Sequence, residues 1–369
     1  MELLLKNANI VTDKDTYMSD IYIKDGVIVN IDKELNIPNI KTVDIGGKYL
    51  VPGGIDVHTH FDIDVGIARS ADNFYTGTLA AACGGTTTVV DHMGFGPKGC
   101  NLHHQLNLYY DLAKDSVIDY SFHGVIQHID EDILKEIDEM IKDGIPSFKG
   151  YMTYGYKLSD MEMLKLSEKL GKSGGLLTVH PENNDMVEFL RAKLASEGKL
   201  APIYHAKSRP DKCEGEAVNR MIDLTAQTNC PLYIVHLSSN EALEHIKRAK
   251  DRGQEVYSET CPQYLVLDEE KYREEDGVKY ICSPPIREKS NQEKLWEGIQ
   301  QGYIQTIATD HCSFNYKMKK EMGATDFRKC PNGLPGVETR MPIIFSEGVS
   351  KGRISVNKFV ELTSTNPAK

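Results

Sequence analysis

The chain has 369 residues, of which 40% are hydrophobic, 26% charged and 8% aromatic, and its formal net charge is −11. This composition is typical of a globular protein with a large core, and it excludes a disordered, collagen-like or small disulfide-stapled chain. The acidic balance and the lack of a basic stripe argue against binding to nucleic acid.

None of the eight cysteines forms a C-x-x-C pair, and a chain of this length needs no covalent staples. Reduced thiols in a cytoplasmic protein are therefore expected. The first ten residues hold one lysine and a short apolar run without a small-residue cleavage site, so no signal peptide is expected. No segment approaches the roughly 20 apolar residues that cross a bilayer, so no membrane partner is expected either.

Residues 1–50 are predicted to form the β-strands of a small sandwich domain. The strand candidates are three apolar or β-branched runs: Leu3–Leu5, Ile21–Ile23 and Val27–Val29. A hairpin turn at Asp25-Gly26 separates the last two runs. Pro52-Gly53-Gly54 then marks a break, and residues 51–369 are predicted to form the second domain.

After Gly54, short apolar runs alternate with longer helix-like segments. The runs are Ile55–Phe61, Thr86–Val90, Tyr120–Ile126, Ser147–Met152, Leu176–His180, Leu232–Leu237, Val256–Thr260 and Ile304–Asp310. The helical segments include Glu131–Asp143, Met161–Lys172, Glu216–Gln227, Asn240–Arg252 and Gln292–Gln301. Eight such units predict an α/β fold of the (β/α)8 barrel type. The segment Arg191–Cys213 is predicted to be an inserted loop or helix pair after the fifth strand.

Four histidines and one aspartate lie at or near the ends of the predicted strands, where barrel enzymes carry their catalytic groups. His58 and His60 are two residues apart on the first strand, so both imidazoles share one face. His180 and Asp310 end the fifth and eighth strands, and His236 lies near the end of the sixth. Each alone could be a solvated or hydrogen-bonded side chain, but together they predict a metal site. Nitrogen and oxygen ligands without cysteine suit zinc, and suit manganese or iron less well.

Lys149 lies in the predicted fourth strand, where a buried cation is costly. Its side chain could extend to the rim of the barrel or pair with an acid. Alternatively, a neutral amine could react with carbon dioxide to give a carbamate that bridges two metal ions. The residue pattern leaves these alternatives open.

The stretch Pro52–His60 resembles the opening signature of the cyclic amidohydrolases, and in particular the dihydropyrimidinase/D-hydantoinase family. The similarity continues in chain order through Gly84–Asp91, Ser147–Lys149, His180–Asn183, His236–Ser239, Cys282–Arg287, Thr309–Cys312 and Pro331–Gly336. It covers essentially the whole chain, and so many ordered matches are specific for the superfamily.

The resemblance implies a role for each matching residue. His58, His60 and Asp310 would hold the more buried of two divalent ions, and His180 and His236 the other. An N6-carboxylated Lys149 and a hydroxide would bridge the two ions. Tyr154 matches the oxyanion-binding tyrosine, and Ser283 and Asn332 match positions whose backbone groups bind the ring amide.

The implied reaction opens a 5,6-dihydropyrimidine or hydantoin to an N-carbamoyl amino acid by attack of the bridging hydroxide. Asp310 would relay the proton to the departing nitrogen. The implied partner is a small cyclic ureide or imide, and the implied assembly is a homodimer or homotetramer. Alternatives are an allantoinase, a non-catalytic scaffold relative and a mononuclear deaminase. The complete ligand set counts against the scaffold, and Lys149 counts against the deaminase.

Two segments depart from the family pattern, and both bear on substrate identity. Gly150–Tyr154 stands where the family has the more apolar Val-Phe-Met-Ala-Tyr, and Phe61–Asp64 stands where it has Leu-Asp-Met-Pro. Family members also continue beyond the match at Asn366–Lys369 with strands that complete the N-terminal sheet. An N-terminal sheet without these partners is expected to expose edges and apolar surface.

Overall fold

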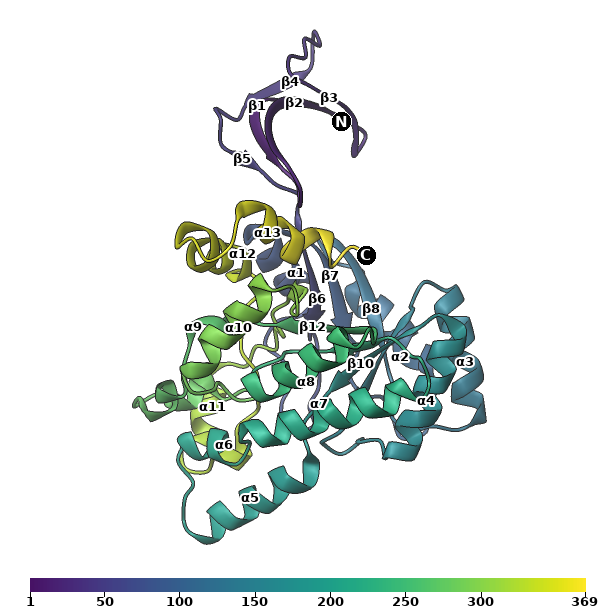
Figure 1. Ribbon diagram of the computed structural model, residues 1–369, viewed down its shortest axis with the longest axis vertical. Helices are drawn as coiled ribbons and strands as arrows, with labels where there is room; N and C mark the ends of the chain where they lie inside the picture. The colour runs from purple at the N-terminus through teal and green to yellow at the C-terminus, as the bar shows by residue number, and fades with distance from the viewer.

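The computed structural model describes residues 1–369, and it contains two sheets of different size (Figure 1). The smaller sheet comprises β1 (Glu2–Val11), β2 (Thr16–Lys24), β3 (Val27–Asp32), β4 (Lys41–Asp44) and β5 (Tyr49–Leu50). Its order is β3-β2-β1-β4, with β5 also paired to β1. The β1–β2 and β2–β3 pairs are antiparallel, and the pairs of β1 with β4 and β5 are parallel.

This small sheet curves away from the rest of the molecule (Figure 1), and few of its apolar residues are buried. Only Ala8, Ile10 and Ile21 form its buried apolar cluster. Every residue of β3 is exposed, including Val27, which is 63% exposed. Outer apolar residues of the sheet therefore face solvent.

The larger sheet confirms the predicted (β/α)8 barrel. Its eight parallel strands follow one another in chain order. They are β6 (Gly54–Thr59), β7 (Thr86–His92), β8 (Asp119–Val125), β9 (Ser147–Tyr151), β10 (Leu176–His180), β11 (Leu232–Ile234), β12 (Val256–Thr260) and β13 (Thr306–Ile307). A parallel bridge between Thr59 and His311 closes the circle, and the His60 amide donates to the His311 carbonyl at 2.8 Å.

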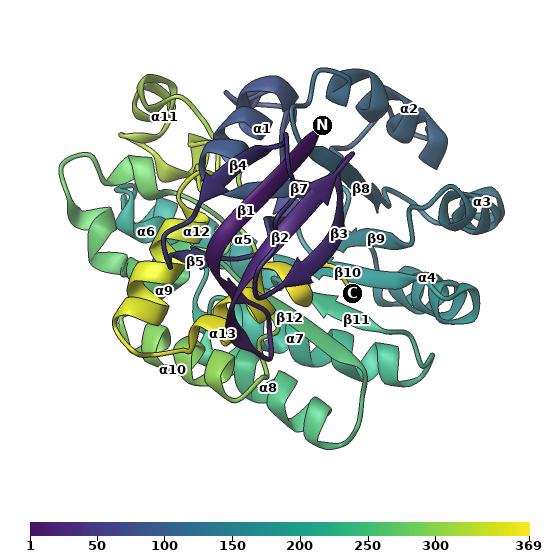
Figure 2. The same cartoon turned by 90° about the horizontal axis from the view of Figure 1, so that it is seen from above.

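Helices surround the strands, as the view from above shows (Figure 2). They are α1 (Phe74–Cys83), α2 (Leu102–Ala113), α3 (Glu131–Lys142), α4 (Asp160–Ser173), α5 (Asn184–Ser196), α6 (Ile203–Lys207), α7 (Asp211–Ala226), α8 (Asn240–Asp251), α9 (Pro262–Val266), α10 (Ser290–Gln300), α11 (Tyr316–Gly323), α12 (Arg340–Ile344) and α13 (Val356–Val360). None of them combines the length and apolar character needed to cross a bilayer. All eight cysteines are free thiols.

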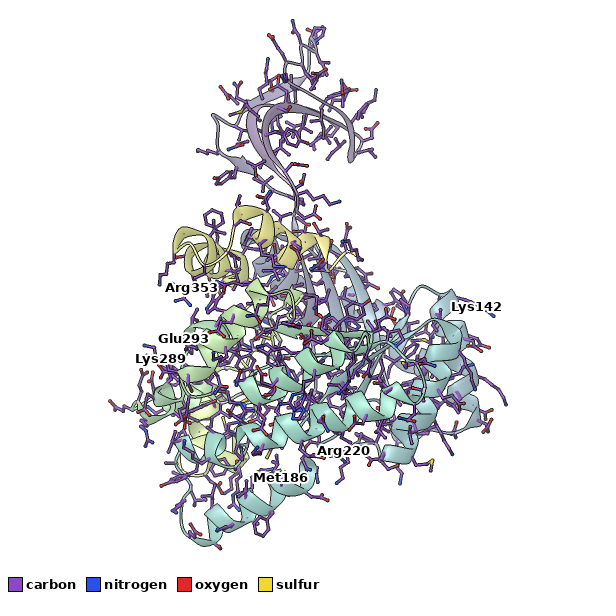
Figure 3. All side chains as sticks on the ribbon, in the orientation of Figure 1. Lys142, Met186, Arg220, Lys289, Glu293 and Arg353 are labelled. Carbon is purple, nitrogen blue, oxygen red and sulfur yellow. The ribbon has the colours of Figure 1, made fainter.

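Local sequence explains why these helices form and how they pack. In α3, the Asp130 side chain accepts from the amides of the first turn, which satisfies donors that a helix start leaves unpaired. Ile133, Ile137 and Met140 follow at helical spacing and are buried against the barrel. The opposite face carries charged residues, and Lys142 projects outward (Figure 3). Such faces contribute to one core of 54 buried residues.

The insertion after the fifth strand is a helix pair, α5 and α6, that leads into α7. It begins at Asn184, earlier than the predicted start at Arg191, because Asn183 caps the helix through its side chain. The strands β11 and β13 are shorter than predicted. His236 and Asp310 therefore lie in the loops just beyond the strands.

Candidate metal centre

One cavity of about 680 Å³ is lined by all nine side chains that the sequence marks as site residues. They are His58, His60, Lys149, Tyr154, His180, His236, Ser283, Asp310 and Asn332. They come from seven separate stretches of the chain, which the closed barrel brings to the carboxyl ends of its strands. This is the end where barrel enzymes assemble their sites.

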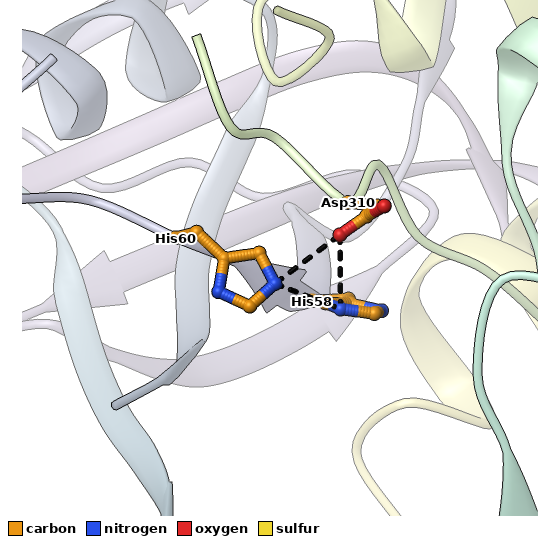
Figure 4. Close-up of side chains that lie close together, drawn as sticks. All are labelled: His58, His60 and Asp310. Atoms are coloured by element: carbon orange, nitrogen blue, oxygen red, sulfur yellow. Dashed lines mark hydrogen bonds and ion pairs between the residues drawn. The ribbon is translucent and has the colours of Figure 1, made fainter. Parts of the chain in front are cut away.

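Three ligand atoms meet on one side of the cavity (Figure 4). His58 Nε2 lies 3.2 Å from His60 Nε2, and Asp310 Oδ1 lies 3.1 Å from the first nitrogen and 3.2 Å from the second. Tetrahedral zinc ligands lie roughly 3.3–3.6 Å apart when each is 2.0–2.2 Å from the ion. The spacing of the three atoms thus fits a single small cation. Burial would raise the pKa of Asp310, but His58 and His60 hold it well below its usual value, so a carboxylate faces the imidazoles.

A second pair of imidazoles lies beside this triangle. His180 Nδ1 and His236 Nε2 are 2.8 Å apart, and the His236 ring centroid is 5.5 Å from that of His58. The cavity therefore brings together two neighbouring sets of candidate ligand atoms, with three atoms in one set and two in the other.

Lys149 lies in β9 and is only 2% exposed. Its ammonium neither reaches solvent nor forms an ion pair with an acid, although Asp310 and Glu259 are close enough to favour the cation. Burial lowers the pKa of Lys149 to about 8. The lowered pKa increases the neutral fraction of the amine near physiological pH, and the neutral form is the one that acts as a nucleophile.

Two buried glutamates orient the histidines, and the sequence patterns did not identify them. His58 Nδ1 contacts Glu259, whose other oxygen accepts from the Tyr233 hydroxyl at 2.9 Å. His180 Nε2 donates to Glu182 at 2.8 Å, and Arg209 pairs with the same carboxylate. These contacts leave His58 Nε2 and His180 Nδ1 free to face the cavity, which is how carboxylates fix ligand histidines.

A signal for both glutamates was present in the sequence. Glu259 is a charged residue inside the apolar run Val256–Thr260, and Glu182 follows His180 by two residues. An acid buried in a strand needs a partner, so each could have been assigned to a nearby histidine.

Tyr154, Ser283 and Asn332 form a polar part of the cavity wall. Tyr154 is 36% exposed, and the partial desolvation of its hydroxyl in the cavity wall raises its pKa despite the nearby Arg209 guanidinium, so the hydroxyl stays protonated at neutral pH. The Ser283 hydroxyl is buried without a partner. The backbone N–H and C=O groups of Ser283 and Asn332 make no hydrogen bond within the protein. Unpaired polar groups of this kind are expected where a ligand supplies the partner.

Three of the site residues adopt left-handed backbone conformations that are unusual for residues with a side chain. Their φ angles are +72° at Tyr154, +40° at His236 and +53° at Asp310. Such conformations cost free energy and persist where the surrounding structure enforces them, commonly at functional sites. Their concentration at one cavity marks it as the functional centre of the molecule.

A closed (β/α)8 barrel with histidines and an aspartate converging at the carboxyl ends of its strands is typical of a metal-binding barrel enzyme. Residues 49–369 match the model of the amidohydrolase family. The chain belongs to this family, which confirms the resemblance seen in the sequence.

Individual relatives are similar over the whole chain. A D-phenylhydantoinase of Escherichia coli O1:K1 is 52% identical, with a match that covers 100% of this chain and 81% of the relative. The crystal structure of dihydropyrimidinase from Brevibacillus agri has a TM-score of 0.98 at 43% identity, covering 100% of this chain and 81% of that one. An L-hydantoinase (dihydropyrimidinase) from Arthrobacter aurescens has a TM-score of 0.91 at 28% identity, covering 99% and 81%.

Proposed function

We propose that the protein is a dinuclear-metal cyclic amidohydrolase that opens a hydantoin or 5,6-dihydropyrimidine ring to an N-carbamoyl amino acid. One observation carries the proposal: a buried lysine without an acidic partner shares a cavity with four histidines and Asp310. The relatives support the choice of ring, since they are a D-phenylhydantoinase, a dihydropyrimidinase and an L-hydantoinase.

His58, His60 and Asp310 would hold one ion, and His180 and His236 the other. Lys149, as an N6-carboxylate, would link the two groups. The set contains only nitrogen and oxygen donors and two imidazoles oriented by carboxylates, which suits zinc. When bound, two divalent ions supply Lewis-acid activation of water and of the scissile carbonyl.

Two side chains of the protein can then transfer the proton of the attacking water and stabilise the negative charge that develops on the carbonyl oxygen. The Asp310 carboxylate can take the proton of the attacking water and return it to the ring nitrogen that departs. The protonated Tyr154 hydroxyl can donate to the carbonyl oxygen as negative charge develops there. The unpaired backbone groups of Ser283 and Asn332 offer both donors and acceptors to the alternating N–H and C=O groups of a ureide ring.

The remaining wall favours an apolar or aromatic substituent on the ring. Phe95 packs on Tyr151 and Tyr156, with ring centroids 5.0 and 4.6 Å apart, and all three line the cavity. Ile63 and Ile67 line the cavity as well. Two of these residues, Tyr151 and Ile63, lie in the two segments that depart from the family pattern. An allantoinase remains the second candidate because it would use the same ligands.

We also propose that the enzyme acts in the cytoplasm as a homodimer or homotetramer. The exposed apolar side chains of the N-terminal sheet support association, because contact between subunits removes such surface from water. Light scattering on the purified protein tests this part independently of activity.

The proposed reaction is tested with a panel of rings. Hydantoin, 5-phenylhydantoin, dihydrouracil and allantoin are offered to purified, zinc-loaded protein, and ring opening is followed by the appearance of the N-carbamoyl product. We expect hydantoins or dihydrouracil to be opened, with about two ions per chain by elemental analysis. Selective opening of allantoin would favour the second candidate, and no opening of any ring would refute the proposal.

A further inference from the structure

A second buried lysine, Lys319, lies outside the metal centre and is also only 2% exposed. It belongs to α11 and forms no ion pair. Its ammonium instead donates to three carbonyls, those of Lys279 at 3.1 Å, Ile281 at 2.8 Å and Gly333 at 2.8 Å. An ammonium has three donors, so each of them has a partner.

Two of the carbonyls belong to the end of a short 3-10 helix (Gly277–Tyr280) and the loop that follows it, and the third belongs to the loop at Gly333. Lys279 and Ile281 precede Ser283, and Gly333 follows Asn332. The loops also touch directly, because the Gly333 amide donates to the Ile281 carbonyl at 3.0 Å. Lys319 thus connects the backbone next to Ser283 with the backbone next to Asn332. These are the two residues whose unpaired backbone groups line the cavity.

The loop that carries Asn332 and Gly333 is closely packed, so its position depends on the hydrogen bond from Lys319. A Cβ atom added at Gly333 would lie 2.2 Å from the Cys312 carbonyl oxygen, two residues after Asp310. In addition, the Cys312 amide donates to the Leu334 carbonyl at 3.0 Å. The loop that carries Asn332 is therefore packed between Lys319 on one side and the segment of Asp310 on the other.

A role in core packing alone does not account for a lysine at this place. A buried ammonium without an acidic partner costs considerable free energy unless polar groups surround it. An apolar side chain of the same length would fill the space without that cost. What it could not do is hold three carbonyls of these two segments at one point.

We propose that Lys319 is a positioning residue that sets the spacing between the backbone groups of Ser283 and Asn332, and thereby the affinity for the ring. This inference rests on the proposed function, since the ring is the ligand that these groups would bind. It assigns Lys319 to recognition of the amide edge and not to the chemical step.

The test compares Lys319→Met with Lys320→Met in the zinc-loaded full chain. Lys320 is the exposed neighbour on the same helix and serves as the matched control. For Lys319→Met we expect KM for hydantoin or dihydrouracil to rise about tenfold with kcat within about twofold, because the lost contacts act on binding. Zinc content should be unchanged. Hydrogen exchange should accelerate in the backbone of residues 279–284 and 330–334, and Lys320→Met should match the wild type.

Lys319→Gln provides a second variant should the methionine protein not fold. Its amide offers two donors for the three carbonyls, so KM and exchange should lie between those of the wild type and of Lys319→Met. Unchanged KM and unchanged exchange in the folded variant would overturn the proposal. So would a parallel loss of zinc and kcat, which would indicate general destabilisation. Exchange is measured without substrate, so failure of the wild type to open any ring would refute the proposed function and leave the positioning role to be judged separately.

Discussion

The N-terminal sheet and the barrel differ most in how much they bury. The sheet has an apolar cluster of three buried residues, whereas the main core of the barrel has 54. All residues of β3 are exposed, so neither face of this strand is covered, whereas the parallel strands of the barrel are covered by helices.

This difference shows which region can keep polar groups buried without a hydrogen-bond partner, although their burial costs free energy. The barrel contains two buried lysines without acidic partners and several buried side-chain atoms without hydrogen bonds. The sheet contains one buried carboxylate, Asp20, with two backbone donors. Groups left unpaired for a ligand need a rigid surrounding, since their cost must be offset by other packing. The barrel supplies that packing and the sheet does not.

The largest expected effect concerns the buried amine of the barrel. Lys149→Ala removes the proposed link between the two ligand groups, so we expect metal content to fall from about two ions per chain and activity to drop by about 10³-fold or more. Elemental analysis and the ring-opening assay measure the two quantities on the same sample. Lys165→Ala, an exposed lysine on α4, is the control and should change neither. Normal turnover by Lys149→Ala would show that Lys149 has no role in the metal centre.

The next prediction compares the barrel and the N-terminal sheet by shortening one apolar side chain in each and measuring the free energy of unfolding. Leu243 in α8 is fully buried, so Leu243→Ala should lower the free energy of unfolding by about 2–5 kcal/mol. Ile28 in β3 is 56% exposed, so Ile28→Ala should change it by no more than about 0.5 kcal/mol. Urea denaturation followed by circular dichroism measures both. Equal losses would show that the sheet buries Ile28 against something in solution.

A smaller effect is expected from the cavity wall. Tyr154→Phe removes a single hydroxyl, and we expect turnover to fall about 10²-fold while both ions are retained, because one oxyanion donor is lost. Tyr316→Phe changes an exposed tyrosine in α11 and is the matched control. Turnover within twofold of the wild type would exclude Tyr154 from stabilising the developing charge.

Much of the barrel could be predicted because its signals are local. Each strand reads as a short apolar run, and His58 and His60 share a face through the two-residue period of a strand. Several contacts that support the histidines of the centre join residues that are far apart in the sequence and meet only in the folded chain. Glu259 contacts His58 across 201 residues of sequence, and Arg209 contacts Glu182 from the connection between α6 and α7. No periodicity encodes such pairs, so they required the assembled barrel. The ends of β11 and β13 were misplaced because apolar loop residues continue the strand pattern.

The smallest expected effect concerns Asp20, the buried carboxylate of the sheet. Burial alone would raise the pKa of Asp20, but the amides of Leu35 and Asn7 and the nearby Lys6 bring it below its ordinary value. A carboxyl whose pKa is lower in the folded state stabilises that state above the pKa of the unfolded chain, and this contribution disappears as pH falls through the folded pKa. The sheet should therefore begin to loosen below about pH 4, the ordinary pKa of an aspartate, and should lose this contribution completely only below the lower pKa of folded Asp20.

Asp20→Asn should mimic the protonated state at neutral pH, at a cost of about 1 kcal/mol that is confined to the sheet. Methyl NMR can follow Ile10 and Ile21 in the sheet and Ile246 in the barrel on lowering pH from 7 to 3. We expect the variant to show at pH 7 the shifts of the sheet methyls that the wild type shows only in acid, with Ile246 unaffected. Asp32→Asn, an exposed carboxylate on β3, should behave like the wild type. If Asp20→Asn instead moved Ile246 and the sheet methyls together, the two regions would unfold as one unit, and the contrast in burial would not translate into separate stability.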